Sequence, residues 1–184
     1  MYIPQSDPER LEEAFVERYP ALNLVTTSNS GAFWGDGDAR TDAIRHDEMQ
    51  FAVEGKYRSA SPKHNWPTPA EWRKAKDQLR VRSSEAIRLF VVYRKQANDF
   101  QVSIPETDLV TSIYYLNEVK DIVDTPTSFR MSNATLMRHT AETLGLNFSR
   151  TKTVADTPMI GFSSQLEFNQ YYQYIEEYRA AVAI

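Results

Sequence analysis

Cysteine is absent from this chain of 184 residues. Disulfide bonds, thiolate nucleophiles and cysteine-ligated zinc sites are therefore excluded. Histidine is nearly as scarce, because the chain has only three histidines and they lie far apart in the sequence, at His46, His64 and His139. A histidine-rich metal centre or a Ser-His-Asp arrangement would therefore have few residues to draw on.

Long apolar runs are lacking as well. No stretch approaches the ~20 residues of a membrane-spanning helix, and residues 1–5 lack the charged and apolar regions of a signal peptide. The composition, 41% hydrophobic and 25% charged, is that of a soluble globular protein. We therefore expect a cytoplasmic protein, not bound to a membrane, with one domain and room for an appended subdomain.

The stretch from Ser30 to Arg58 concentrates acids, a lysine and glycines around one apolar run. Its segment 49–56 alternates apolar with small or polar residues, which predicts a strand with one buried face. Glu54 and Lys56 would then leave the exposed face of that strand about 6–7 Å apart along the backbone. Such a pair can hold a cation and a nucleophilic water side by side. Three residues are expected to face the core: Met49, Phe51 and Val53.

A second carboxylate comes from the run 38–44, if residues 45–48 form the turn of a hairpin. Residue numbers that face each other would then sum to about 92 or 93, which sets Asp38 opposite Glu54 or Gly55. Asp42 would lie ~13 Å further along the ladder. Two carboxylates and the Gly55 carbonyl are oxygen ligands suited to Mg2+.

These motifs resemble the PD-(D/E)xK nuclease superfamily, and within it the Holliday-junction-resolvase-like proteins of bacteriophages and archaea. The resemblance covers about residues 9 to 95. It implies an α/β fold whose mixed central sheet is flanked by helices, Mg2+ as cofactor with Mn2+ able to substitute, and DNA recombination as the setting. It also implies that Asp38 and Glu54 bind the metal, and that Lys56 activates or orients the attacking water. The motifs that carry it are Ser30-Gly31-Ala32, Gly37-Asp38, Glu54-Gly55-Lys56 and Trp72 in a following helix.

A helix is predicted from about Ser6 to Tyr19, with Pro8 in its first turn and a capping box completed by Glu9. Resolvase-like nucleases place a glutamate of this first helix close to the metal. The resemblance therefore makes Glu9 or Glu13 a further catalytic candidate, and the choice between them stays open.

The segment from Lys56 to Lys95 has eleven lysines or arginines against three acids, a balance of +8, whereas the whole chain carries −4 and the remainder therefore −12. This asymmetry predicts a basic face that meets phosphates. Within the segment, Thr68-Pro69-Ala70-Glu71 predicts a capping box that opens a helix to about Val81. The expected DNA contacts, including the Ser-Gly loop implied by the resemblance, are Ser30, Arg40, Arg58, Lys63, Arg73, Lys74 and Lys76.

Two alternatives have to be weighed. A second Glu-x-Lys triplet, Glu118-Val119-Lys120, follows Asp108 by ten residues, although the segment 117–120 has the composition of a solvated linker. The protein could also be a non-catalytic nucleic-acid-binding or virus structural protein on the same fold. The preferred hypothesis is a Mg2+-dependent endonuclease that acts on branched or otherwise structured DNA.

Residues 1–105 are expected to form the nuclease core, with strands near 22–27, 86–93 and 100–104. Residues 106–184 would be a mostly helical extension, packed on the core or forming a dimer interface. Within it, residues 109–116 could be strand or helix, and helices are predicted at 133–144 and 165–184. The last helix carries an apolar stripe, and symmetric cutting of a four-way junction needs two sites, so a homodimer is predicted. The stripe consists of Phe168, Tyr171, Tyr172, Ile175 and Tyr178.

Overall fold

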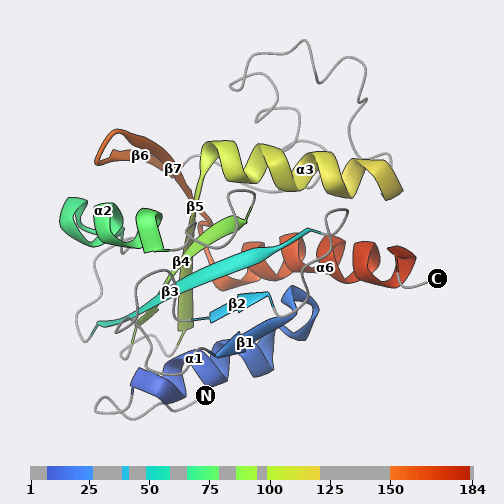
Figure 1. Ribbon diagram of the computed structural model, residues 1–184, viewed down its shortest axis with the longest axis horizontal. Helices are drawn as coiled ribbons and strands as arrows, with labels where there is room; N and C mark the ends of the chain where they lie inside the picture. Colours follow the sequence, from blue (N-terminus) through green and yellow to red (C-terminus); the bar gives the residue numbers. More distant parts are fainter. Residues whose placement is uncertain are drawn as a thin grey trace.

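The protein is an α/β structure built on a mixed seven-stranded sheet with strand order β1-β2-β3-β4-β5-β7-β6 (Figure 1). The computed structural model describes residues 8–26, 39–41, 49–58, 66–78, 86–94, 99–120 and 150–182. Its elements are α1 (Pro8–Arg18), η1 (Pro20–Leu22), β1 (Leu24–Thr26), β2 (Ala39–Thr41), β3 (Phe51–Arg58), α2 (Pro69–Gln78), β4 (Ile87–Arg94), β5 (Asp99–Pro105), α3 (Glu106–Lys120), β6 (Thr151–Val154), β7 (Thr157–Gly161) and α6 (Gln165–Val182).

The first half of the chain forms a three-stranded meander followed by a crossover. β1, β2 and β3 pair antiparallel, and α2 then connects β3 to its parallel neighbour β4. β5 returns antiparallel to β4, and the β6–β7 hairpin extends the sheet through β7. The predicted order of helix, strand, hairpin, helix and strand is therefore confirmed.

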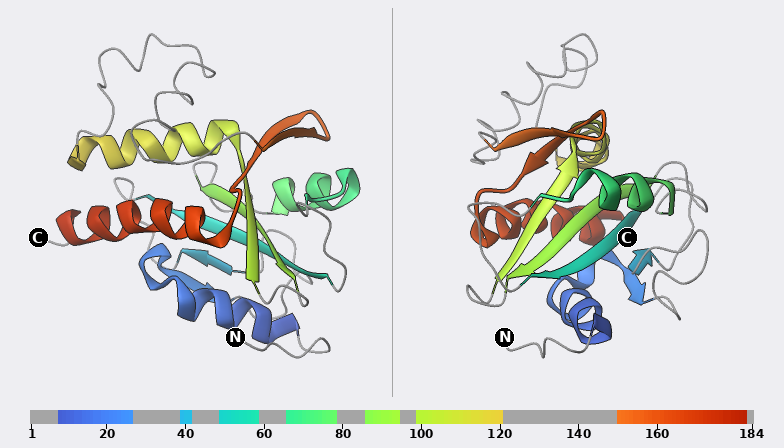
Figure 2. Two further views of the ribbon diagram at one scale, coloured as in Figure 1. Left: turned by 180° about the vertical axis from the view of Figure 1, so that it is seen from behind. Right: turned by 90° about the vertical axis from the view of Figure 1, so that its left-hand side faces the viewer.

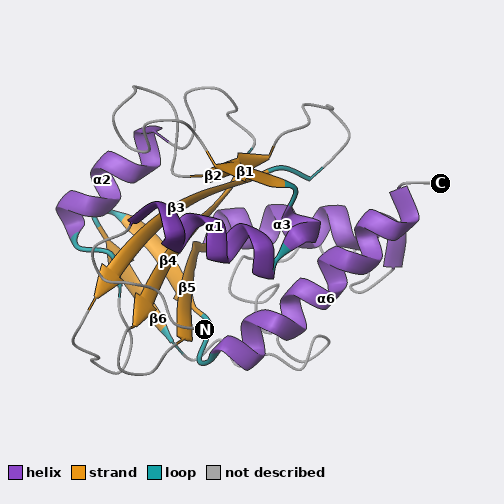
Figure 3. Ribbon diagram, turned by 90° about the horizontal axis from the view of Figure 1, so that it is seen from below, coloured by secondary structure: helices purple, strands orange, loops and turns teal. Residues whose placement is uncertain are grey.

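The two faces of the sheet are covered by different helices, because alternate residues of β3 and β4 point to opposite sides. Phe51 and Val53 join the main core with Phe15 of α1 and several side chains of α6. Ala52 joins a second cluster with Trp72 of α2 and Met159 of β7. We call these the α1/α6 face and the α2 face. Figure 2 shows α2 and α6 on opposite sides of the strands, and Figure 3 shows α1 lying across the sheet.

The aromatic stripe of α6 is buried within its own chain. All five of its members are at most 7% exposed, and they belong to the main core, which also includes β3, β4 and β5. The stripe is therefore not a dimer interface, and the prediction that it could form one is wrong. Apolar side chains at helical spacing indicate burial, but they do not show whether the buried partner is the same chain or another copy.

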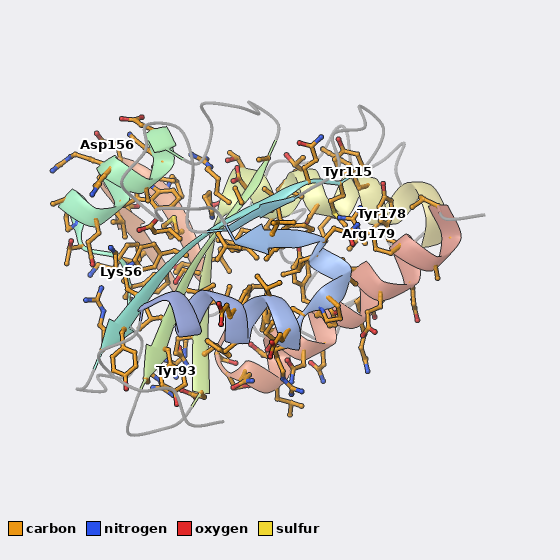
Figure 4. The ribbon with its side chains drawn as sticks, turned by 60° about the horizontal axis from the view of Figure 1, so that its bottom comes forward. Lys56, Tyr93, Tyr115, Asp156, Tyr178 and Arg179 are labelled. Carbon is orange, nitrogen blue, oxygen red and sulfur yellow. The ribbon has the colours of Figure 1, made fainter. Side chains whose placement is uncertain are left out.

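The last turns of α6, where Tyr178 and Arg179 lie (Figure 4), also hold the start of β3. The Met49 N–H donates to the Tyr178 hydroxyl at 3.3 Å, and Arg179 donates to the Met49 carbonyl. Arg179 further donates from Nε to the Ala21 carbonyl at 2.8 Å, while the Ala21 N–H donates to the Tyr172 hydroxyl. Residues on both sides of the domain boundary predicted after residue 105 thus share one continuous core.

One prediction for the extension was wrong: residues 117–120, expected as a linker, form the last turn of α3. The run 109–116, for which strand and helix were both open, is helical. The β6–β7 hairpin was missed, because its two-residue turn is Ala155-Asp156 and lacks the glycine or asparagine that marks such turns. The predicted helix 133–144 lies outside the described residues.

Candidate catalytic site on strand β3

Glu54 and Lys56 form an ion pair on the α2 face of β3. The Lys56 Nζ lies 3.3 Å from the Glu54 Oε1, which confirms that residues two apart on this strand project from one face. The Glu54 side chain is 9% exposed and that of Lys56 is 37% exposed. The expectation that Glu54 lies on an exposed face is therefore wrong: the carboxylate is buried, and the ammonium reaches the surface.

Glu54 is buried because the α2 face is covered. Trp72 and Ala75 of α2 pack with Ala52, the preceding residue on this face of β3. On the other side, β4 pairs Phe90 with Glu54 in the parallel ladder. An ionised carboxylate in such surroundings loses solvation, and a nearby ammonium offsets part of that loss. The pair stands at the border between core and solvent, where a charged substrate could reach it.

The predicted hairpin register is confirmed. Ala39 of β2 pairs with Val53, and Arg40 pairs with Ala52, so that both sums of residue numbers are 92. Asp38, which precedes Ala39, lies outside the described residues, and so do Ser30 and Lys63. Ala39 is thus the described residue that lies closest in sequence to Asp38, the predicted metal ligand.

The Gly55 carbonyl is directed to the β2 side of β3. The Ile87 N–H of β4 donates to the Gln50 carbonyl at 2.8 Å, so Gln50 directs its carbonyl toward β4. Successive carbonyls along a strand point to alternate sides, and Gly55 is five residues further on. This backbone oxygen therefore lies on the side of β3 that borders the end of β2.

Glu13 is not brought to this pair. It is exposed on α1, and its neighbours Ala14 and Phe15 pack into the α1/α6 face. Glu54 points to the α2 face, on the other side of the sheet. The side chain of Glu9, the alternative candidate, lies outside the described residues.

The donor set is suited to a hard cation but is incomplete in the described part of the chain. Among those residues, no three acid or histidine side chains gather closely enough to hold a metal ion. Glu54 and the Gly55 carbonyl supply oxygen ligands, the kind that Mg2+ and Mn2+ prefer. Asp38 is the residue that would have to complete the set.

The predicted DNA-contacting residues that the structure describes lie on three elements, α2, β3 and β2. Arg73 and Lys74 are exposed on α2, and Lys76 is half-buried there. Arg58 follows Lys56 on the same face of β3 and contacts Glu71, with Nη2 2.7 Å from Oε1. Arg40 lies in β2, where only its backbone pairing is described.

Two other arginines of the basic segment belong to internal ion pairs. Arg94 binds Asp99 through Nε at 2.8 Å and Nη2 at 2.6 Å. Arg88 is 8% exposed and binds Asp108, which is 2% exposed, also through two nitrogens. The count of eleven basic residues therefore overstates the charge available to a phosphate.

The Arg88–Asp108 ion pair and the helical conformation of α3 together exclude the second Glu-x-Lys triplet as a metal site. Asp108 is engaged by Arg88 near the start of α3, whereas Glu118 lies ten residues further along the same helix. Ten helical residues span ~15 Å, so the two backbones are too far apart to share a metal ion. Sequence patterns did not predict the role of Asp108, because its partner Arg88 comes from a distant strand.

None of the helices in the described part of the chain is long and apolar enough to cross a membrane. No protein-family model matches the sequence, and no curated protein or solved structure matches it. Function is therefore inferred from the site itself and from the resemblance of its motifs.

Proposed function

We propose that the protein is a Mg2+-dependent endonuclease that hydrolyses phosphodiester bonds in branched or otherwise structured DNA. The observation that carries the proposal is the Glu54–Lys56 ion pair, on a strand that pairs with β2 in the predicted register, Ala39 with Val53. The order of helix, strand, hairpin, helix and strand supports a restriction-endonuclease-like core.

In this proposal Asp38, Glu54 and the Gly55 carbonyl hold the cation. A bound Mg2+ would supply a Lewis acid and a water of lowered pKa. The Lys56 ammonium, held 3.3 Å from Glu54, orients the attacking water and stabilises the negative charge that develops on the phosphate. Burial of Glu54 strengthens these interactions, because water screens charges less in a covered site.

Cleavage of a labelled four-way DNA junction in Mg2+ tests the proposal. Glu54→Gln removes one charge with little change in shape and should lower the rate by about a hundredfold or more. Asp38→Asn should have a similar effect, and a chelator should abolish cleavage. Full activity of Glu54→Gln, or full activity in chelator, would contradict the proposed site.

The non-catalytic alternative predicts a different result. A nucleic-acid-binding or virus structural protein would bind the junction with the same affinity in the wild type and in Glu54→Gln, and neither would cleave it. The homodimer also stays a prediction, and it now depends only on the two-fold symmetry of a junction. Light scattering tests it against the 21.2 kDa mass of one chain.

A further inference from the structure

The α2 face of β3 carries a third charged residue in line with the ion pair. Glu54, Lys56 and Arg58 alternate with residues that point to the other face. Each step of two residues advances ~6.6 Å along the strand. Arg58 therefore stands one step beyond Lys56, on the side away from Glu54.

Glu71 holds the Arg58 guanidinium at the start of α2. The Glu71 Oε1 accepts from Arg58 Nη2 at 2.7 Å and from the Thr68 N–H at 2.9 Å. The Glu71 N–H in turn donates to the Thr68 hydroxyl at 3.1 Å. The capping box predicted from the sequence is thus confirmed, and its carboxylate has a second role that no local pattern indicated.

Glu71 stays charged in this arrangement. Burial acts to raise the pKa of its carboxyl, but the Thr68 N–H and the Arg58 guanidinium outweigh burial and hold the pKa below its ordinary value. At neutral pH the Glu71 carboxylate is ionised, so it attracts the Arg58 guanidinium as a full negative charge. The guanidinium is consequently preorganised rather than free to sample many rotamers.

Arg58 keeps capacity for a second partner. The guanidinium has five N–H donors, the contact with Glu71 uses Nη2, and 29% of the side chain is exposed. The neighbouring Arg94, paired with Arg58 in the β3–β4 ladder, differs because Asp99 engages two of its nitrogens. Of these two adjacent arginines, Arg58 is better suited to bind an anion.

We propose that Arg58, positioned by Glu71, binds the backbone phosphate adjacent to the one that is cleaved at Glu54 and Lys56. This inference rests on the proposed function. A planar guanidinium binds phosphate through two parallel hydrogen bonds, which a lysine cannot do. The site would then select an internal phosphodiester of a polynucleotide over a short ester with a single phosphate.

The test is a scan of DNA junctions in which one phosphate at a time, on either side of the cut, is a neutral methylphosphonate. Affinity is measured without divalent metal, so that cleavage does not enter the result. In the wild type, one position beside the cut should weaken binding about tenfold or more, as for a hydrogen bond to a charged group. The same substitution should have no added effect on Arg58→Ala.

Two further variants separate binding from folding. Arg58→Lys keeps the charge. At that phosphate, the methylphosphonate should weaken its binding more than it weakens binding by Arg58→Ala, but less than it weakens binding by the wild type. Arg94→Ala, a matched control on the next strand, should keep the wild-type pattern across all positions. Circular dichroism and the melting temperature show whether each variant is folded.

Glu71→Gln tests the positioning role. If Glu71 only caps α2, the variant should melt at a lower temperature and keep the wild-type pattern along the DNA. If Glu71 positions Arg58, the loss of affinity caused by the methylphosphonate at that one phosphate should become severalfold smaller. The losses caused by methylphosphonates at the other positions should stay unchanged.

Equal patterns for the wild type and Arg58→Ala would overturn the inference, and so would the absence of measurable DNA binding. Cleavage that survives Glu54→Gln would instead overturn the proposed function and would leave the binding pattern as measured.

Discussion

The Arg88 guanidinium and the Asp108 carboxylate form a buried two-point ion pair that joins β4 to the first turn of α3. Arg88 Nε lies 2.9 Å from Asp108 Oδ2, and Nη2 lies 3.2 Å from Oδ1. The backbone N–H of Arg88 donates to the same carboxylate at 2.9 Å, and the guanidinium stacks on Trp72, 5.3 Å from the ring centroid. Through Trp72, this pair thus connects helix α2, which packs on the same face of the sheet as Glu54, to the rest of the core.

Breaking this pair should destabilise the fold strongly. Asp108→Asn leaves the buried Arg88 charge without its counter-ion, and we expect a loss of about 3–5 kcal/mol in the free energy of unfolding. The double variant Arg88→Met with Asp108→Asn should lose less, because no uncompensated charge remains. Urea unfolding measures both. A double variant no more stable than Asp108→Asn would show that packing, not charge, sets the loss.

Stability should fall in alkaline solution. Burial raises the pKa of Tyr19, Tyr171 and Tyr172 above the ordinary value of 10.0. The unfolded chain then loses these protons at lower pH than the folded one, so the stabilisation is complete below pH 10 and declines as pH rises through the folded pKa values. Each tyrosine contributes at most about 1.4 kcal/mol per pH unit.

Urea unfolding at several pH values between about 9 and 12 tests this expectation. Tyr172→Phe should reduce the slope of stability against pH. Tyr174→Phe, at a half-buried position of the same helix, is the matched control. A slope that does not change in Tyr172→Phe would assign the alkaline loss to other groups.

The turn between β6 and β7 should be open to stabilisation. Ala155 and Asp156 both have positive φ, 45° and 69°, as a type I′ turn requires. Glycine has no Cβ atom and asparagine tolerates positive φ better than alanine does, so Ala155→Asn with Asp156→Gly should raise the free energy of unfolding by about 1 kcal/mol. Ala155→Val should lower it. Thermal unfolding of the three proteins measures the order, and a stabilising valine would contradict the assigned turn.

Glu13 should be dispensable for catalysis. It is exposed on α1, which covers the face of the sheet opposite to Glu54. Glu13→Gln makes the same chemical change as Glu54→Gln, and its cleavage rate should stay within about twofold of the wild type. Loss of cleavage in Glu13→Gln, with an unchanged melting temperature, would place the first helix at the metal after all.

The exposed basic residues of α2 should contribute affinity rather than chemistry. Arg73→Gln and Lys74→Gln together should weaken binding to every DNA sequence and reduce the slope of log affinity against log salt by about one unit per lost phosphate contact. Arg18→Gln, on α1, is a control of the same kind and should leave the slope unchanged. Equal slopes for all variants would place the DNA-binding surface elsewhere.

Local patterns in the sequence determined the elements that surround the site. Alternation at residues 49–56 predicted β3 and the shared face of Glu54 and Lys56, and the hairpin register followed from turn position. Thr68 and Glu71 predicted the start of α2, since a capping box involves residues only three apart. These features depend on neighbours in the chain, which a sequence displays directly.

Only the tertiary structure decided how these elements cover one another. The α6 stripe became core rather than interface, Glu54 became buried instead of exposed, and Asp108 became the partner of Arg88 instead of a metal ligand. Each outcome depends on which distant element packs on a given face. Periodicity states that a face is buried but carries no information about its partner, so packing alone assigned Glu71 to Arg58 and α1 to the face opposite Glu54.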